Sequence, residues 1–173
     1  IMDKGMDTGD ILLVDETPIE PTDDAQSLHD KLSEQGGELV LETLSRLQKN
    51  DILPTPQNAD LASYAPKLKK EESLIDWGLD ADKIFNNVRG LSPWPGTHTL
   101  YNGKRLAILK AEVVAGESSD SPGHVARITD SGIEIGTGKN RLKITELKPE
   151  GKKAMPVKSF LSGYKINRND KLG

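Results

Sequence analysis

A carboxylate within a glycine turn is the feature of this sequence best suited to chemistry. The chain begins Ile-Met-Asp-Lys-Gly-Met-Asp-Thr-Gly-Asp, so Asp7 precedes Gly9 just before an apolar run at 11–14. A tight turn of this kind would present the Asp7 carboxylate at the carboxyl edge of a parallel sheet, where open α/β folds bind ligands. The same pattern also suits an Asp that only hydrogen-bonds its own turn.

The elements expected around this turn are a strand and a helix. Residues 11–19 predict a strand buried on both faces, as in parallel sheets. Residues 21–24 supply helix-capping side chains, and leucines at helical spacing predict a helix over about 24–49, with Gly36-Gly37 indicating a kink or close packing. One strand and one helix make no core, so residues 1–60 are expected to be the end of a Rossmann-like α/β domain that began upstream.

A second domain is predicted after a proline-containing linker over 51–66. A helix is expected at about 80–89, followed by strands at 97–101, 104–114, 123–128, 132–136 and 141–147. Asn102-Gly103 is a strong hairpin signal because both residues tolerate a positive φ. Short strands at this spacing favour an OB-like, five-stranded β-barrel over 67–173, a fold that commonly binds nucleic acids.

Charge is divided unevenly along the chain. Residues 1–66 carry four basic and fourteen acidic side chains, whereas residues 139–173 carry ten basic and three acidic ones. A positive field of this kind suits either a polyanionic partner or an ordinary solvated surface. The absence of cysteine excludes disulfides and thiolate chemistry, and no apolar run reaches the roughly 18 residues of a membrane span.

Several further segments carry a family resemblance. They are Tyr64-Ala65-x-Lys67-Leu68-x-Lys70-Glu71-Glu72, Ile75-Asp76-Trp77, Val88-Arg89-Gly90, Pro93-Trp94-Pro95-Gly96 and Gly151-Lys152-Lys153-Ala154-Met155. Together with the Asp7 turn, and in this order and spacing, they resemble the folate-dependent formyltransferases, in particular those that act on methionyl-tRNA.

The resemblance implies transfer of the formyl group of 10-formyltetrahydrofolate to the amino group of methionyl-initiator tRNA. Asp7 matches the catalytic aspartate of the family. The folate-binding residues implied are Met2, Gly5, Met6, Asp7 and Thr8. The tRNA-binding residues expected from the resemblance and the basic composition are Lys67, Lys69, Lys70, Lys139, Arg141, Lys152 and Lys153. The family's catalytic Asn and His belong to an upstream segment that this sequence lacks, so the fragment alone is expected to be inactive.

Two other functions fit parts of the pattern. A sugar-nucleotide formyltransferase or a 10-formyltetrahydrofolate hydrolase-type domain would share several motifs, though not the basic Lys152-Lys153 loop. A non-enzymatic nucleic-acid-binding module would require residues 1–60 to fold alone. We also expect Trp77 and Trp94 in the core, no metal site, and a monomeric, cytoplasmic protein without a membrane partner.

Overall fold

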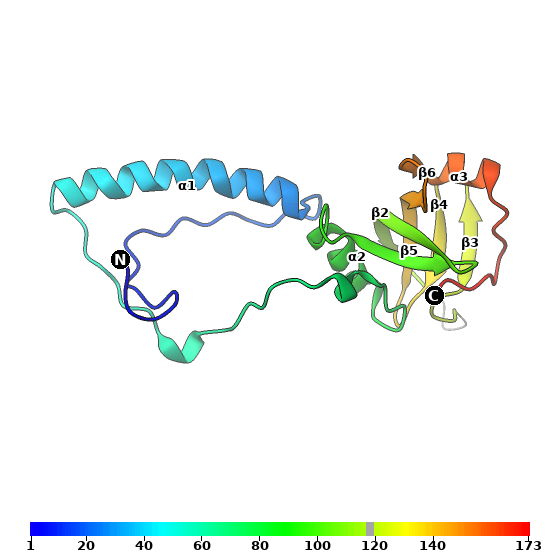
Figure 1. Ribbon diagram of the computed structural model, residues 1–173, viewed down its shortest axis with the longest axis horizontal. Helices are drawn as coiled ribbons and strands as arrows, with labels where there is room; N and C mark the ends of the chain where they lie inside the picture. The colour runs from blue at the N-terminus through cyan, green and yellow to red at the C-terminus, as the bar shows by residue number, and fades with distance from the viewer. Residues whose placement is uncertain (117–119) are drawn as a thin grey trace. The chain divides into compact units, whose positions relative to one another are not determined.

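The computed structural model describes residues 1–116 and 120–173, which form two compact units. Unit 1 comprises Ile1–Lys67 and unit 2 comprises Leu68–Gly173, so the predicted linker over 51–66 lies wholly within unit 1. Unit 1 contains the long helix α1 (Ala25–Gln48) and a 3-10 turn, η1 (Ala59–Leu61), whereas unit 2 carries the strands (Figure 1). In the described part of the chain, no helix combines the length and the apolar character needed to cross a membrane.

Helix α1 begins where its capping residues predict. The Asp24 carboxylate accepts a hydrogen bond from the Ser27 backbone N–H at 2.8 Å, and the Ser27 hydroxyl oxygen accepts one from the Asp24 N–H at 3.1 Å. This reciprocal capping box satisfies backbone donors that a helix start leaves without intrahelical partners. The helix predicted over about 24–49 is thereby confirmed as Ala25–Gln48.

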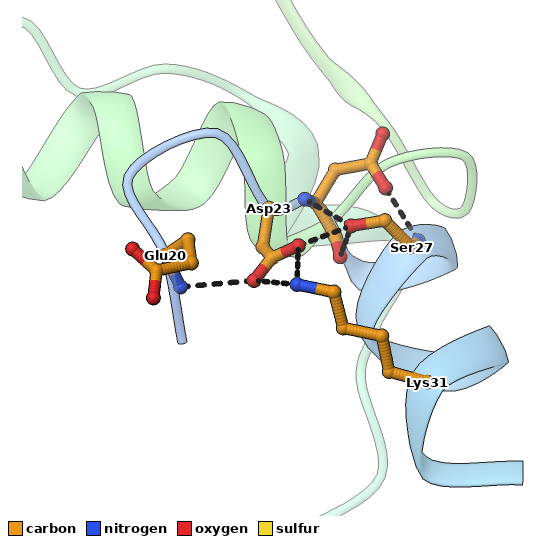
Figure 2. A network of polar contacts seen from close by, with 5 residues as sticks. Glu20, Asp23, Ser27 and Lys31 are labelled. Atoms are coloured by element: carbon orange, nitrogen blue, oxygen red, sulfur yellow. Dashed lines mark hydrogen bonds and ion pairs between the residues drawn. The ribbon is translucent and has the colours of Figure 1, made fainter. Parts of the chain in front are cut away.

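A second carboxylate, Asp23, ties the preceding segment to the helix (Figure 2). Lys31 Nζ lies 2.7 and 2.8 Å from its two oxygens, while the Glu20 N–H and the Ser27 hydroxyl each donate to it at 2.9 Å. The hydrogen bond from Lys31, then those from Glu20 and Ser27, lower the pKa of Asp23 to about 2. Asp23 therefore stays ionised at neutral pH and fixes Glu20 beside the second turn of α1.

The strand predicted over 11–19 is not found. Ile11 makes one antiparallel bridge to Thr55, and residues 1–67 contain no strand. Ile11 and Val14 are 39% and 70% exposed. A strand buried on both faces needs covering layers and paired neighbours, which unit 1 does not supply. The Rossmann-like arrangement is therefore not confirmed.

Helix α1 leaves its apolar stripe open within the described structure. None of its residues is buried, and Leu32 and Leu44 are 49% and 53% exposed. The helix continues through Gly36 and Gly37, where an added Cβ would meet no atom within 4 Å. Close packing against the described residues therefore does not account for these glycines.

Unit 2 is built on a six-stranded antiparallel sheet. Its strands are β1 (Thr97–Tyr101), β2 (Lys104–Val114), β3 (Val125–Thr129), β4 (Gly132–Gly136), β5 (Arg141–Pro149) and β6 (Met155–Pro156). The order is β1-β2-β5-β4-β3, with β6 paired to β5. The first five strands and helix α2 (Ala81–Gly90) confirm the predicted elements. Sequence periodicity does not reveal β6, helix α3 (Val157–Gly163) or the 3-10 turn η2 (Lys70–Ser73), because each is too short.

The expected closed barrel is not confirmed, because β1 and β3 remain the two edges of the described sheet. Residues 169–173 run along the β3 edge instead: the Leu172 N–H donates to the Gly123 carbonyl at 2.8 Å, and the Val125 N–H donates to the Asp170 carbonyl at 2.9 Å. The Gly173 N–H donates to the Leu100 carbonyl of β1 at 2.9 Å. This tail thus satisfies backbone groups on both edges.

Tyr101 fixes the tail against the β1–β2 hairpin. Its hydroxyl lies 2.8 Å from the Lys165 carbonyl oxygen and 3.1 Å from Asp170 Oδ2, both of them acceptors. Burial, followed by the hydrogen bond to Asp170, raises the pKa of Tyr101. The hairpin itself turns at Asn102-Gly103 with φ values of 51° and 72°, as the sequence predicts.

The core of unit 2 lies between the sheet and its helices. Ile84 and Val88, one turn apart on α2, join Ile108 of β2 and Leu147 of β5 in a single buried cluster, to which α3 adds Phe160. Helical spacing of the apolar residues gives α2 one buried face.

The two tryptophans differ in their environments. Trp77 is 6% exposed, as expected, and its indole N–H donates to Thr99 Oγ1 at 3.1 Å. Trp94 is 57% exposed, so the expectation of a core position is wrong. Leu91 is the buried residue of this turn, and its carbonyl accepts the Gly96 N–H at 2.8 Å. The smaller side chain therefore anchors the turn.

His98 connects β1 to the segment before α2. Its carbonyl accepts the Ile75 N–H at 2.8 Å, and its Nδ1 lies 3.1 Å from Ser73 Oγ. Burial and the charge of Arg105 lower the pKa of His98, and a hydrogen bond with the Ser73 backbone offsets part of this effect.

Arg141 lies inside an ion cluster, although the sequence suggested a tRNA contact. Its Nε and Nη2 donate to the two oxygens of Asp120 at 2.6 and 2.9 Å, and its Nη1 donates to Glu134 Oε2 at 3.1 Å. The Arg141 and Glu134 side chains are each 10% exposed. The bidentate geometry makes the guanidinium a structural clamp between β4, β5 and Asp120.

The lowered pKa of His98 predicts that unit 2 loses stability on acidification. In the unfolded chain this imidazole takes up a proton near pH 6.5, whereas the folded chain resists protonation until a lower pH, so the free energy of unfolding falls as the pH drops below about 6.5. We expect His98→Gln to weaken this dependence in urea unfolding at about pH 7.5 and about pH 5.5. His29→Gln, on exposed α1, is the control and should retain it. If the free energy of unfolding of His98→Gln falls between the two pH values as much as that of the unchanged chain, the prediction is contradicted.

Replacing the Arg141 clamp should destabilise unit 2. In Arg141→Met the carboxylates of Asp120 and Glu134 lose their shared guanidinium in a mostly buried site, which is expected to cost about 3–5 kcal/mol in urea unfolding. Lys143→Met is the matched control, because Lys143 pairs with Glu112, which is 59% exposed, and should cost less than about 1 kcal/mol. Equal small losses in the two variants would argue against a structural clamp.

Candidate functional site

The loop around Asp7 is held through its backbone. Gln57 Nε2 donates to the carbonyl oxygens of Asp7 and Gly9 at 2.9 and 2.7 Å. The Ile11–Thr55 bridge follows directly, with N–O distances of 2.9 and 2.8 Å. A glutamine fifty residues away in sequence therefore fixes the shape of the loop.

Local geometry also restricts the residues of this loop. Asp7 has a φ of 56°, in the left-handed region that Asp and Asn tolerate better than most residues. At Gly5 an added Cβ would lie 2.5 Å from Thr8 Oγ1, the hydroxyl that donates to Asp3 Oδ2 at 3.2 Å. A side chain at position 5 would therefore displace Thr8, and position 7 favours residues that tolerate a positive φ.

The loop presents its side chains to solvent. Met2 and Met6 are 97% and 87% exposed. Asp7, which lies between Met6 and Thr8, is exposed as well. Among the described residues, no hydrogen bond engages the Asp7 carboxylate. Such a carboxylate can accept a proton from an attacking amine, and the neighbouring thioether side chains can pack against a flat apolar ring.

The three lysines expected near the linker are also exposed. Lys67 lies in unit 1, while Lys69 and Lys70 lie at the start of η2 in unit 2. In the part of the chain that the structure describes, none of their ammonium groups forms an ion pair. The Glu72 carboxylate accepts a hydrogen bond from the Lys69 backbone N–H at 3.3 Å, so all three ammonium groups are available to a phosphate.

The remaining predicted lysines do not form one cluster. Lys139 precedes β5, whereas Lys152 and Lys153 follow it, and a nine-residue strand spans about 30 Å. All three are exposed. Lys139 and the pair Lys152 and Lys153 therefore lie at opposite ends of β5, and the buried Arg141 does not contribute to the exposed basic surface.

Two cations that sequence reasoning missed lie beside Lys152. Lys104 and Arg105 begin β2, and the Glu150 N–H donates to the Arg105 carbonyl at 3.0 Å. The Arg105 N–H in turn lies 3.3 Å from Glu150 Oε2. We call Lys104, Arg105, Lys152 and Lys153 the basic end of the sheet. Asn102-Gly103 predicts the hairpin that contains Lys104 and Arg105, but local sequence does not predict the pairing of β2 with β5.

A metal site requires a group of side chains that could together bind the ion. Across residues 1–116 and 120–173, no three His, Asp or Glu side chains gather closely enough to hold a metal ion. His29, His98 and His124 lie on separate elements, α1, β1 and the segment before β3.

Comparison with known proteins gives the wider context of both regions. Residues 67–165 match the family model described as the formyl transferase C-terminal domain. A methionyl-tRNA formyltransferase of Citrifermentans bemidjiense is 44% identical over 173 residues, which is 100% of this chain and 54% of the relative. The corresponding protein of Caldanaerobacter subterraneus subsp. tengcongensis is 45% identical over 166 residues, covering 96% of this chain and 53% of that one. The chain thus spans about half the length of these relatives.

Solved structures with the same fold include HypX from Aquifex aeolicus. One variant, carrying six alanine substitutions, aligns with a TM-score of 0.65 at 25% identity, over 96% of this chain and 30% of HypX. HypX in complex with tetrahydrofolic acid aligns with a TM-score of 0.64 at 22% identity, over 96% and 32%. Because the family model covers more than half of the sequence, the chain belongs to the formyl transferase family, with residues 67–165 matching its C-terminal domain.

Proposed function

We propose that this chain is the C-terminal half of an enzyme that transfers the formyl group of 10-formyltetrahydrofolate to the amino group of methionyl-initiator tRNA. The observation that carries the proposal is the 44% identity, extending over both units, to a protein named methionyl-tRNA formyltransferase. The relatives compared give no support to the sugar-nucleotide, hydrolase or non-enzymatic alternatives.

Asp7 is proposed to handle the proton of the reaction. When the neutral methionyl amine attacks the formyl carbon, a new C–N bond forms and the amine nitrogen loses a proton. The bond between the formyl carbon and the folate nitrogen then breaks, and the departing folate nitrogen takes up a proton. An exposed carboxylate without a competing partner can accept that proton. Developing charge on the formyl oxygen requires hydrogen-bond donors. The family resemblance assigns that role to an Asn and a His that this sequence lacks, so we propose that the chain alone is inactive.

The folate donor is proposed to lie against the loop from Met2 to Thr8. The geometry fits such a group because Met2 and Met6 are exposed for apolar contact, while the Gln57 hydrogen bonds hold the backbone of Asp7 and Gly9. The solved neighbour bound to tetrahydrofolic acid supports a folate-type donor for this fold. In the bound state, the donor supplies the formyl group.

Unit 2 is proposed to hold the tRNA. Lys152 and Lys153 extend from a turn fixed between β5 and β6, and Lys104 and Arg105 lie beside it. Exposed cations on a rigid framework neutralise backbone phosphates and release counterions, which gives affinity without reading sequence. Lys67, Lys69 and Lys70 would add phosphate contacts elsewhere on the tRNA.

Asp7→Asn in the full-length enzyme should reduce the formyl-transfer rate by about 10²–10⁴-fold, because the amide cannot take up the proton. The amide still suits the positive φ, so the loop and the tRNA affinity should be retained. Single-turnover transfer with separate measurement of tRNA binding tests this expectation. Asp10→Asn, at the end of the same loop, is the control and should stay active. Full activity of Asp7→Asn would refute the assignment of Asp7. Turnover by the isolated chain would refute the proposal that it is inactive alone.

A Lys152→Ala/Lys153→Ala variant of this chain should bind tRNA with a weaker dependence on salt. Two lost phosphate contacts reduce the slope of log K against log salt by about 1.4–1.8. Fluorescence anisotropy with labelled tRNA over a salt series gives the slope. Lys83→Ala/Lys171→Ala removes two exposed lysines outside the basic end and is the control. Identical slopes in the two double variants would exclude Lys152 and Lys153 as phosphate contacts.

A further inference from the structure

A pocket of about 280 Å³ lies at the basic end of the sheet, entirely within unit 2. Three segments line it: the β1–β2 hairpin from Tyr101 to Leu106, the turn from Pro149 to Lys152, and Phe160 with Tyr164 at α3. Two sequence motifs contribute Asn102 and Lys152 to its lining, but neither motif predicts a pocket.

The inner part of the pocket is apolar and aromatic. Leu106 and Phe160 are 3% and 1% exposed, and the rings of Phe160 and Tyr164 stack with centroids 4.4 Å apart and planes 13° from parallel. Tyr101 and Tyr164 are partly exposed, so a ligand can reach both rings. Stacking on Phe160 fixes the Tyr164 ring, and the bonds from the Tyr101 hydroxyl to Lys165 and Asp170 fix the other. The aromatic surface is therefore already formed without a ligand.

The rim of the pocket is polar and mostly cationic. Lys104, Arg105 and Lys152 are exposed on it, against one carboxylate, Glu150. Glu150 is held by the two bonds with the Arg105 backbone, while Asn102 adds a side-chain amide beside the hairpin turn. The rim thus offers phosphate-binding cations together with groups that can donate or accept hydrogen bonds at the edge of a flat ring.

An aromatic interior together with a cationic rim indicates which class of ligand the pocket suits. Small-molecule sites usually occupy about 300–1,000 Å³, and a pocket at the lower limit suits one planar ring system rather than a folded cofactor. Proteins bind single-stranded nucleic acids through aromatic side chains that stack on bases and cations that follow the backbone. Simple phosphate binding would not require the aromatic interior.

We propose that this pocket takes one unstacked base of an RNA, with Lys104, Arg105 and Lys152 holding its neighbouring phosphates. The inference rests on the proposed function, since it assigns a base-binding role to part of the surface proposed to hold tRNA. It adds a contribution that phosphate contacts lack, because stacking on a base persists when salt screens the cations. A base in a loop or at a strand end can enter the pocket, whereas a base inside a duplex cannot.

The test compares two probes of equal charge on the intact chain: a short adenine ribo-oligonucleotide and an abasic oligonucleotide of the same length. Stacking predicts about 5- to 150-fold tighter binding of the base-bearing probe by fluorescence anisotropy. Tyr164→Leu should bring this ratio towards one, and Tyr164→Phe should preserve it. Tyr64→Leu, which removes a tyrosine 87% exposed in unit 1, is the matched control and should keep the ratio. Lys152→Ala should weaken both probes equally.

A second measurement keeps the test independent of how well Tyr164→Leu folds. In the native chain, the base-bearing probe should shift the ring-proton resonances of Tyr164 and Phe160, and the abasic probe should not. Equal binding of the two probes, or a ratio retained in folded Tyr164→Leu, overturns the pocket assignment. If the pocket assignment fails but intact tRNA still binds with the salt dependence of phosphate contacts, the proposed function stands. If neither tRNA nor either probe binds, the proposed role of unit 2 in holding tRNA fails along with the pocket.

Discussion

The antiparallel pairing of β2 with β5 is the interaction on which unit 2 depends. It extends from Leu106 opposite Pro149 to Val114 opposite Arg141, with register shifts around Lys110. Its central residues, including Ile108 and Leu147, form the surface that packs with α2. Because extra residues within a ladder bend and twist a strand, the irregular register of β2 helps the sheet curve around its core.

The two ends of this ladder have different chemical roles. At one end Arg141 enters a buried cluster with Glu134 and Asp120. At the other, the β1–β2 hairpin lies beside the turn after β5, which places Lys104 and Arg105 near Lys152. A single register therefore decides which cations stabilise the sheet and which remain available to a partner.

Local sequence predicted the elements of unit 2 but not their arrangement. Turn residues such as Asn102-Gly103 and alternating apolar residues are local signals, so five strands and α2 could be located. Strand order is set by pairings between distant residues, so neither the open sheet nor the proximity of Arg105 to Glu150 could be predicted. Arg141 shows the same limit, because its charge is visible in the sequence and its carboxylate partners are not.

In unit 1, too, features set by neighbouring residues could be predicted, whereas features that depend on distant residues could not. Helix α1 was predictable because Asp24 and Ser27 cap it locally, whereas the apolar run at 11–14 could not specify a strand without neighbours. Asp7 was identified through family resemblance. The role of Gln57 in positioning Asp7 could not be predicted, because a side chain that hydrogen-bonds two distant carbonyls leaves no periodic pattern in the sequence. The residues of this loop can thus be proposed as a site from the sequence, whereas the side chain that supports the loop cannot be predicted.

The tail at 169–173 also bears on the order in which unit 2 can become complete during synthesis. These residues pair with Gly123 and Val125 and with Leu100, and Leu172 is 1% exposed. Contacts between residues so far apart form late, because the intervening chain must first be confined. While the tail is still within the ribosome, both outer strands carry open backbone groups, and a nascent chain in that state can pair with another strand. Once residues 169–173 have emerged and paired, they occupy these backbone groups and leave fewer of them open to a strand of another chain.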